Sequence, residues 1–159
     1  IEIQDIAHAL DNLCRFTGHC HRYYSVAEHS IRVAKYLESI GESREVPLWG
    51  LLHDASEAYL CDIPRPLKIL PEFAFYRQAE AAVQKVICEK FSLPITQPEI
   101  VTQADMRMLA AEKKEIMGPE PASWGELASP APWTGRYDTL AWSKWDFLEM
   151  FAKLAVKAP

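Results

Sequence analysis

The spacing of the apolar residues restricts the fold of this chain more than any other feature of its sequence. Apolar side chains recur three or four residues apart over long stretches, as they do on one face of an α-helix. No run of four to eight residues sustains the period-two alternation that is typical of a half-buried strand. The periodicity therefore predicts an all-α fold, with helices over residues 3–14, 26–40, 47–59, 72–92, 99–117 and 138–156.

Capping residues mark the ends of the second of these helices. Ser25-Val-Ala-Glu28 has the spacing of a capping box, in which the Ser and Glu side chains each bind an otherwise unpaired backbone N–H. Gly41 is expected to end the helix as its left-handed C-terminal residue.

Two segments are predicted to be irregular. Pro64 and Pro66 restrict the backbone and remove donors, so residues 61–68 should form a rigid loop that carries charge and not a regular helix. A stretch rich in Pro, Gly and Trp between residues 118 and 135 predicts a long loop before the last helix. Such a loop is compatible with a lid, an oligomer contact or a flap.

Composition limits the size, the partners and the compartment. The 159 residues, 49% of them hydrophobic and 25% charged, suit one compact domain over residues 1–159. A net charge of −5 argues against an extended nucleic acid as partner, because binding a phosphate backbone needs many basic contacts. The sequence contains neither a membrane-spanning apolar run nor a basic, then apolar leader, so no membrane association and a cytoplasmic location are expected.

The adjacent residues His53 and Asp54 interrupt an otherwise apolar helical stretch. Burying a carboxylate costs several kcal/mol unless it is paired, hydrogen-bonded or bound to a metal, so the interruption needs a reason. His29 and Asp105 also lie on predicted apolar helix faces, and Glu57 follows Asp54 by three residues. His29, His53, Asp54 and Asp105 could therefore converge on one cation.

Each of these residues also has a simpler interpretation. A single histidine on an apolar face is commonly a hydrogen-bonded core residue, and Asp105 could cap its helix or pair with Arg107. Glu57 could be an exposed helix carboxylate, and Asp62 could stabilise a turn. Lys68 could be a solvated loop residue.

The order of these residues resembles the HD superfamily of metal-dependent phosphohydrolases. The similarity covers about residues 3–117, through Ser25-Val-Ala-Glu-His29-Ser, His53-Asp-Ala-Ser-Glu57 and Asp62-Ile-Pro-Arg-Pro-Leu-Lys68. It is greatest toward the bacterial 5′-deoxynucleotidases and the small phage dATP triphosphohydrolases. The resemblance implies a compact helical bundle in which His29, His53, Asp54 and Asp105 hold one divalent metal ion.

The same resemblance implies roles for five further residues. Arg15 and Phe16 stand where these enzymes have an Arg followed by an aromatic residue that contacts phosphate and selects the sugar, although Trp is the usual aromatic. Glu57 would be a catalytic acid or base or a ligand to a second metal, and Asp62 a further acidic catalytic residue. Lys68 would bind phosphate.

The sequence thus predicts a phosphohydrolase for a small nucleotide substrate, in which a metal-bound hydroxide attacks either the 5′-phosphate of a dNMP or the α-phosphate of a dNTP. The donor set suits Mn, Co, Ni, Fe, Mg or Zn. A homo-oligomer is expected, as in related enzymes. The alternative is a non-catalytic HD-fold module that senses nucleotides.

A third hypothesis is a structural zinc protein, in which Cys14 and the His19-Cys20-His21 stretch bind the ion. The spacing is poor for such a site, because neighbouring side chains diverge. The tryptophans of the last third of the chain are expected to serve in packing or in a subunit interface, with base stacking as the alternative: Trp124, Trp133, Trp142 and Trp145.

Overall fold

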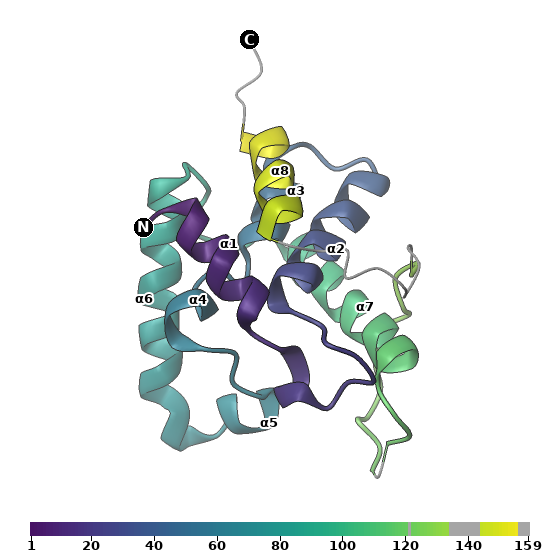
Figure 1. Ribbon diagram of the computed structural model, residues 1–159. Coiled ribbons are helices and arrows are strands. Elements are labelled where there is room, and N and C mark those ends of the chain that lie inside the picture. The colour runs from purple at the N-terminus through teal and green to yellow at the C-terminus, as the bar shows by residue number, and fades with distance from the viewer. Residues whose placement is uncertain (121, 134–143, 156–159) are drawn as a thin grey trace.

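The computed structural model of the chain describes residues 1–120, 122–133 and 144–155, and these residues form a bundle of helices (Figure 1). The longer helices are α1 (Ile3–Asn12), α2 (Val26–Ser39), α3 (Glu45–Leu52), α6 (Ala74–Lys90), α7 (Glu99–Ile116) and α8 (Lys144–Ala155). The described residues contain no strand, only two isolated β-bridges. The predicted all-α fold is confirmed. In the part of the chain that is described, no helix combines the length and apolarity needed to cross a membrane.

Helix α2 lies at the centre of the bundle, where α1, α3, α7 and α8 all pack against it. Its residues Ile31 and Leu37 are fully buried, together with Leu51 of α3, Met108 of α7 and Phe147 of α8. Burying one such side chain stabilises the fold by about 1.5–3 kcal/mol. This shared core fixes α2, α3 and α7 relative to one another, and these are the elements from which the candidate site is built.

The predicted cap of α2 forms only in part. The Ser25 hydroxyl accepts a hydrogen bond from the Glu28 backbone N–H at 3.1 Å. The Glu28 carboxylate does not return to the cap, because it binds the guanidinium groups of Arg22 and Arg32. At the other end of the helix, Gly41 has a φ of 86°, the left-handed conformation that was expected.

The helix predicted from Pro47 to about Tyr59 is wrong, because the structure breaks it in two. Helix α3 ends at Leu52 and α4 (Glu57–Leu60) starts five residues later. Between them the chain tightens into a turn, in which the Ala55 N–H donates to the carbonyl of Leu52 three residues back. The amide side chain of Gln84 in α6 holds this turn, since it accepts from the Ser56 N–H and donates to the Leu52 carbonyl.

The prediction that residues 61–68 are irregular throughout is also wrong. Residues Arg65–Lys68 form the short helix α5, which is followed by the 3₁₀ helix η2 (Pro71–Phe73) and then by α6. Pro66 stands in the first turn of α5, where a backbone N–H has no partner within the helix and its loss costs little.

The long loop before the last helix is irregular where the structure describes it, over residues 118–120 and 122–133. Its end is anchored to α7, because the Ala131 N–H donates to the carbonyl of Arg107. Trp142 and the predicted helical residues 138–143 lie outside the described residues.

Candidate metal centre

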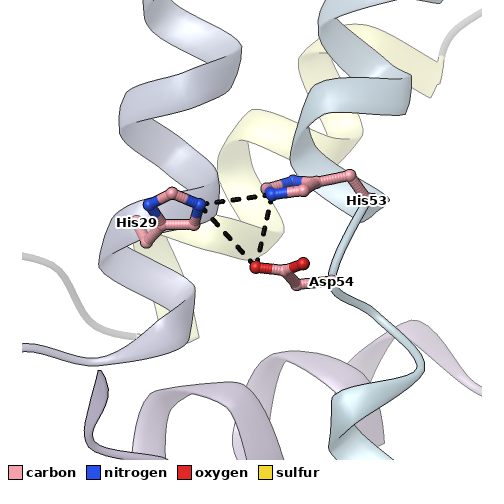
Figure 2. A group of neighbouring side chains, drawn as sticks. All are labelled: His29, His53 and Asp54. Carbon is pink, nitrogen blue, oxygen red and sulfur yellow. Dashed lines mark hydrogen bonds and ion pairs between the residues drawn. The ribbon is translucent and has the colours of Figure 1, made fainter. Parts of the chain in front are cut away.

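Three side chains converge between α2 and the turn that follows α3 (Figure 2). His29 of α2 and His53 face each other through their Nε2 atoms, which are 3.2 Å apart. The Oδ2 atom of Asp54 lies 3.2 Å from Nε2 of His53 and 3.7 Å from Nε2 of His29. These three donor atoms form a triangle that could hold a metal ion.

Asp105 of α7 brings a second carboxylate to the same pair of histidines. Its Oδ1 atom lies 3.1 Å from Nε2 of His29 and 3.9 Å from Nε2 of His53. The guanidinium of Arg107, which the sequence offered as another partner for Asp105, lies over the ring of Tyr36. The fold therefore gathers all four residues that the sequence singled out as metal ligands.

His53 and Asp54 are neighbours in sequence, and both contribute a donor atom to the centre. In a continuous α-helix, the side chains of consecutive residues project about 100° apart. His53 stands at the C-terminal end of α3 and Asp54 in the tight turn after it. Both side chains nevertheless reach His29, since Nε2 of His53 lies 3.2 Å and Oδ2 of Asp54 lies 3.7 Å from Nε2 of His29.

The spacing of the donor atoms fits a divalent metal ion. With metal–ligand distances of about 2.1 Å, neighbouring ligand atoms in octahedral or tetrahedral sites lie about 3.0–3.4 Å apart. The separations among His29, His53 and Asp54, from 3.2 to 3.7 Å, are at or close to these values. Two imidazoles and one or two carboxylates suit Mn, Co, Ni, Fe or Zn ions, and the carboxylates also suit Mg.

Hydrogen bonds on the far side of each histidine leave Nε2 free to bind a cation. His29 Nδ1 lies 2.5 Å from Oε1 of Glu112, and His53 Nδ1 lies 2.7 Å from the Gly50 carbonyl oxygen. An ionised carboxylate and a carbonyl only accept hydrogen bonds, so each Nδ1 carries the proton. In the neutral rings, both Nε2 lone pairs then point into the centre, as metal-binding histidines require.

The electrostatics of the centre favour a positive charge within it. Burial alone would lower the pKa of His53, but the carboxylates of Asp54 and Asp105 outweigh it and raise that pKa to about 9. Burial would raise the pKa of Asp54, yet His53, His29 and Arg15 hold it well below its usual range. The imidazoles and carboxylates stabilise each other's charged forms, and the same field attracts a metal cation.

Glu57 lies beside the centre and is only 4% exposed, which removes its interpretation as an exposed helix carboxylate. Its Oε1 atom is 3.3 Å from Nζ of Lys68, whereas its buried Oε2 atom has no hydrogen-bond partner. Burial and the nearby charges of Asp54 and Asp62 raise the pKa of Glu57 to about 9. A carboxyl group in this state can donate a proton near neutral pH.

Lys68 is a half-buried residue with defined partners and not a solvated lysine. Its ammonium group lies 2.7 Å from Glu80 Oε1, in addition to the contact with Glu57. Asp62 is partly buried nearby, and burial raises its pKa against the opposing charges of Arg15 and Lys68. Both predicted residues therefore border the centre.

Arg15 bridges two carboxylates at the centre. Its guanidinium lies 3.4 Å from Asp54 Oδ2 through Nη1 and 3.3 Å from Glu112 Oε2 through Nη2. The ring of Phe16 lies next to this guanidinium, with its centroid 5.3 Å from the Arg15 Cζ atom. The two residues thus connect the metal-binding group to an apolar surface.

Glu112 is a site residue that was not predicted, and the position of Trp124 was left open by the sequence. Glu112 is completely buried and contacts both His29 and Arg15. The Trp124 ring lies 6.0 Å from that of Phe16, tilted by 41°, and remains 39% exposed. A signal for Glu112 was present in its spacing, because it follows Asp105 by seven residues and so lies on the same face of α7.

The alternative zinc site gains no support from the described residues. His19 and His21 are exposed, and the thiol of Cys20 donates to the backbone carbonyl of Arg15. The metal-binding group found among the described residues consists of His29, His53 and Asp54.

Comparison with known proteins finds two uncharacterized bacterial relatives. The chain is 39% identical over 128 residues to the protein YfdR of Escherichia coli, a match that covers 80% of this chain and 67% of the relative. It is 36% identical over 128 residues to a protein of Rhodobacter capsulatus, covering 74% of this chain and 64% of that relative. No family model matches the chain. The chain thus spans about two thirds of the length of these relatives.

Proposed function

This chain belongs to the same family as the uncharacterized protein YfdR, and we propose, from the chemistry of its own residues, that it is a metal-dependent phosphohydrolase of the HD type that acts on deoxynucleotides. The observation that carries this proposal is the joint position of His29, His53, Asp54 and Asp105, with the cation of Arg15 and the acid of Glu57 beside them. Metal, phosphate-binding cation and proton donor are the three components that hydrolysis of a phosphate ester needs.

His29, His53, Asp54 and Asp105 would hold one divalent cation. When bound, the cation supplies Lewis acidity, which polarises a phosphoryl oxygen and lowers the pKa of water. The hydrogen bonds from Nδ1 of each histidine keep the rings oriented for this role.

Arg15 and Lys68 would bind the phosphate of the substrate. The Arg15 guanidinium lies 3.4 Å from Asp54 Oδ2, so its donors border the group of residues that would hold the cation and could bind a phosphate there. The ammonium group of Lys68 would contact the phosphate from the side of Glu57, whose Oε1 atom lies 3.3 Å from Lys68 Nζ. These two cations offset the negative charge that three or more carboxylates would otherwise present to an anionic substrate.

Hydrolysis forms a bond from a water oxygen to phosphorus and breaks the bond between phosphorus and the 5′-oxygen of the nucleoside. The leaving 5′-oxygen needs a proton, which the buried carboxyl of Glu57 is placed to donate. Asp62 can accept the proton that the attacking water loses, since its carboxylate borders the same centre. A dNMP would yield nucleoside and inorganic phosphate, and a dNTP would yield nucleoside and triphosphate.

Phe16 and Trp124 would provide the surface for the nucleoside. Phe16 follows the phosphate-binding Arg15 directly, and its ring contacts that of the partly exposed Trp124. Aromatic rings of this kind stack against nucleobases regardless of base identity. This arrangement favours a nucleotide over a smaller phosphate ester.

The proposal is tested by chromatographic product analysis after incubation with each dNMP, dNTP and ribonucleotide in the presence of Mn²⁺, Co²⁺ or Mg²⁺. The chain carrying both His53→Ala and Asp54→Ala should lose activity, whereas His8→Ala, which removes an exposed histidine of α1, should retain it. If the double variant releases product as fast as the unaltered chain, the proposed site is wrong. If the unaltered chain binds metal but hydrolyses none of these nucleotides, the non-catalytic sensor is favoured instead.

A further inference from the structure

We infer that Glu112 is a positioning residue that joins the metal centre to the phosphate-binding arginine, an inference that rests on the proposed function. Glu112 has no solvent exposure, and both of its carboxylate oxygens have partners. Oε1 accepts from His29 Nδ1 and, at 2.7 Å, from the hydroxyl of Tyr24. Oε2 lies 3.3 Å from Nη2 of Arg15.

The contact with His29 sets which nitrogen of that ring can bind a metal ion. A carboxylate at Nδ1 keeps a proton there, so in the neutral ring Nε2 carries the lone pair and is directed at His53 and Asp105. The negative charge also makes Nε2 a stronger electron donor. Glu112 should therefore raise the affinity of the centre for a cation that it does not itself touch.

The contact with Arg15 fixes the second half of the site. The guanidinium is held between Glu112 on one side and Asp54 on the other, so its orientation depends on both carboxylates. A phosphate bound by Arg15 would then lie in a fixed direction from the metal ligands. One carboxylate on α7 thus positions a ligand from α2 and a cation from the segment before it.

A purely structural role does not explain why a carboxylate occupies this position. Burying an ionised carboxylate costs several kcal/mol, and a packed apolar residue commonly fills such a space at no loss of stability. The burial is explained if the charge acts on His29 and Arg15. The hydroxyl of Tyr24 supplies the additional hydrogen bond that holds the carboxylate in place.

Glu28 offers a matched control for the effect of a buried carboxylate. It is 5% exposed, and its partners are Arg22 and Arg32. Glu28→Gln therefore perturbs a buried charge network of α2 without removing a contact to the metal ligands.

The test is the dissociation constant of Mn²⁺ measured by titration calorimetry for the unaltered chain, Glu112→Gln and Glu28→Gln. Glu112→Gln should weaken binding about 10- to 100-fold, the usual effect of removing an outer partner of a metal ligand. Glu28→Gln should change it less than about twofold. The visible spectrum of bound Co²⁺ should change in Glu112→Gln and stay the same in Glu28→Gln, which separates an altered ligand field from a merely less stable fold.

Equal Mn²⁺ affinity and equal Co²⁺ spectra in the unaltered chain and Glu112→Gln would overturn the inference while leaving the proposed metal centre intact. An unaltered chain that binds neither ion would instead overturn the proposed function, and the inference with it. Should Glu112→Gln fail to fold, the nitrogen-15 spectrum of the histidines in the unaltered chain loaded with Zn²⁺ decides. A His29 Nδ1–H proton signal shifted far downfield, as a hydrogen bond to a carboxylate produces, supports the inference, and an Nδ1–H signal at the position of a solvent-exposed imidazole refutes it.

Discussion

Binding of a divalent cation should stabilise the fold, and chelation should remove that stabilisation. The donors come from three separate parts of the chain, namely α2, the turn after α3, and α7. Unfolding disperses them, so the unfolded chain cannot offer the same site and the full binding free energy favours the folded state. At a metal concentration 100 times the dissociation constant, the gain in the free energy of unfolding is about 2.7 kcal/mol.

For a chain of 159 residues, each kcal/mol shifts the melting temperature by about 2–4 °C, so saturation should raise it by about 5–11 °C. The assay is thermal unfolding followed by circular dichroism, with EDTA and then with increasing Mn²⁺, Co²⁺ or Mg²⁺. The chain with both His53→Ala and Asp54→Ala loses two of the three grouped donors and should shift by less than about 2 °C.

Either of two results would refute this reasoning. One is an unaltered chain that melts at the same temperature in EDTA and in millimolar concentrations of every cation. The other is a double variant that is stabilised as much as the unaltered chain, because the ion would then bind elsewhere.

Other consequences of the structure can be checked separately. Glu57→Gln should lower kcat about 100-fold or more but leave the Mn²⁺ dissociation constant unchanged, as kinetics and calorimetry would show, and an unchanged kcat would exclude Glu57 as the proton donor. Trp124→Ala should cost about 1 kcal/mol of nucleotide binding, seen as a KM about five times higher at similar kcat, and an unaltered KM would exclude stacking. Gly41→Ala forces a side chain into a φ of 86° and should destabilise the fold by about 1–2 kcal/mol in urea denaturation, and an unchanged midpoint would contradict a constraint on the backbone at this residue. Burial raises the pKa of Cys20 to about 11, so at pH 8 iodoacetamide should modify the exposed Cys61 first in peptide mass mapping, and equal rates would contradict the burial of Cys20.

The sequence was sufficient to predict most of the longer helices and four of the residues that meet at the centre, because their apolar spacing and polar interruptions are local patterns. Polar groups on apolar helix faces indicated His29 and Asp105, and the fold places their side chains 3.1 Å apart. The start of α2 at Ser25 was equally visible, since a cap depends on residues only three positions apart.

Features that depend on distant contacts could not be predicted in this way. The apolar pattern continues through Ala55, so periodicity alone extends α3 past its true end; the turn is held by Gln84, about 30 residues later in the chain. Glu112 stands directly before Lys113 and Lys114, which are typical of a solvated helix face and obscure its seven-residue spacing from Asp105. Its role depends on His29, from which it is separated by 83 positions.

The distances along the chain between the metal ligands also bear on how the protein folds. His29 and His53 are 24 residues apart, and Asp105 reaches them only when α7 has docked on α2. Contacts of such long range form late, so most of the centre should be absent from the folding transition state. A bound cation should then slow unfolding and leave the folding rate nearly unchanged. In stopped-flow experiments, added metal should therefore lower the unfolding rate constant and leave the folding rate constant nearly the same.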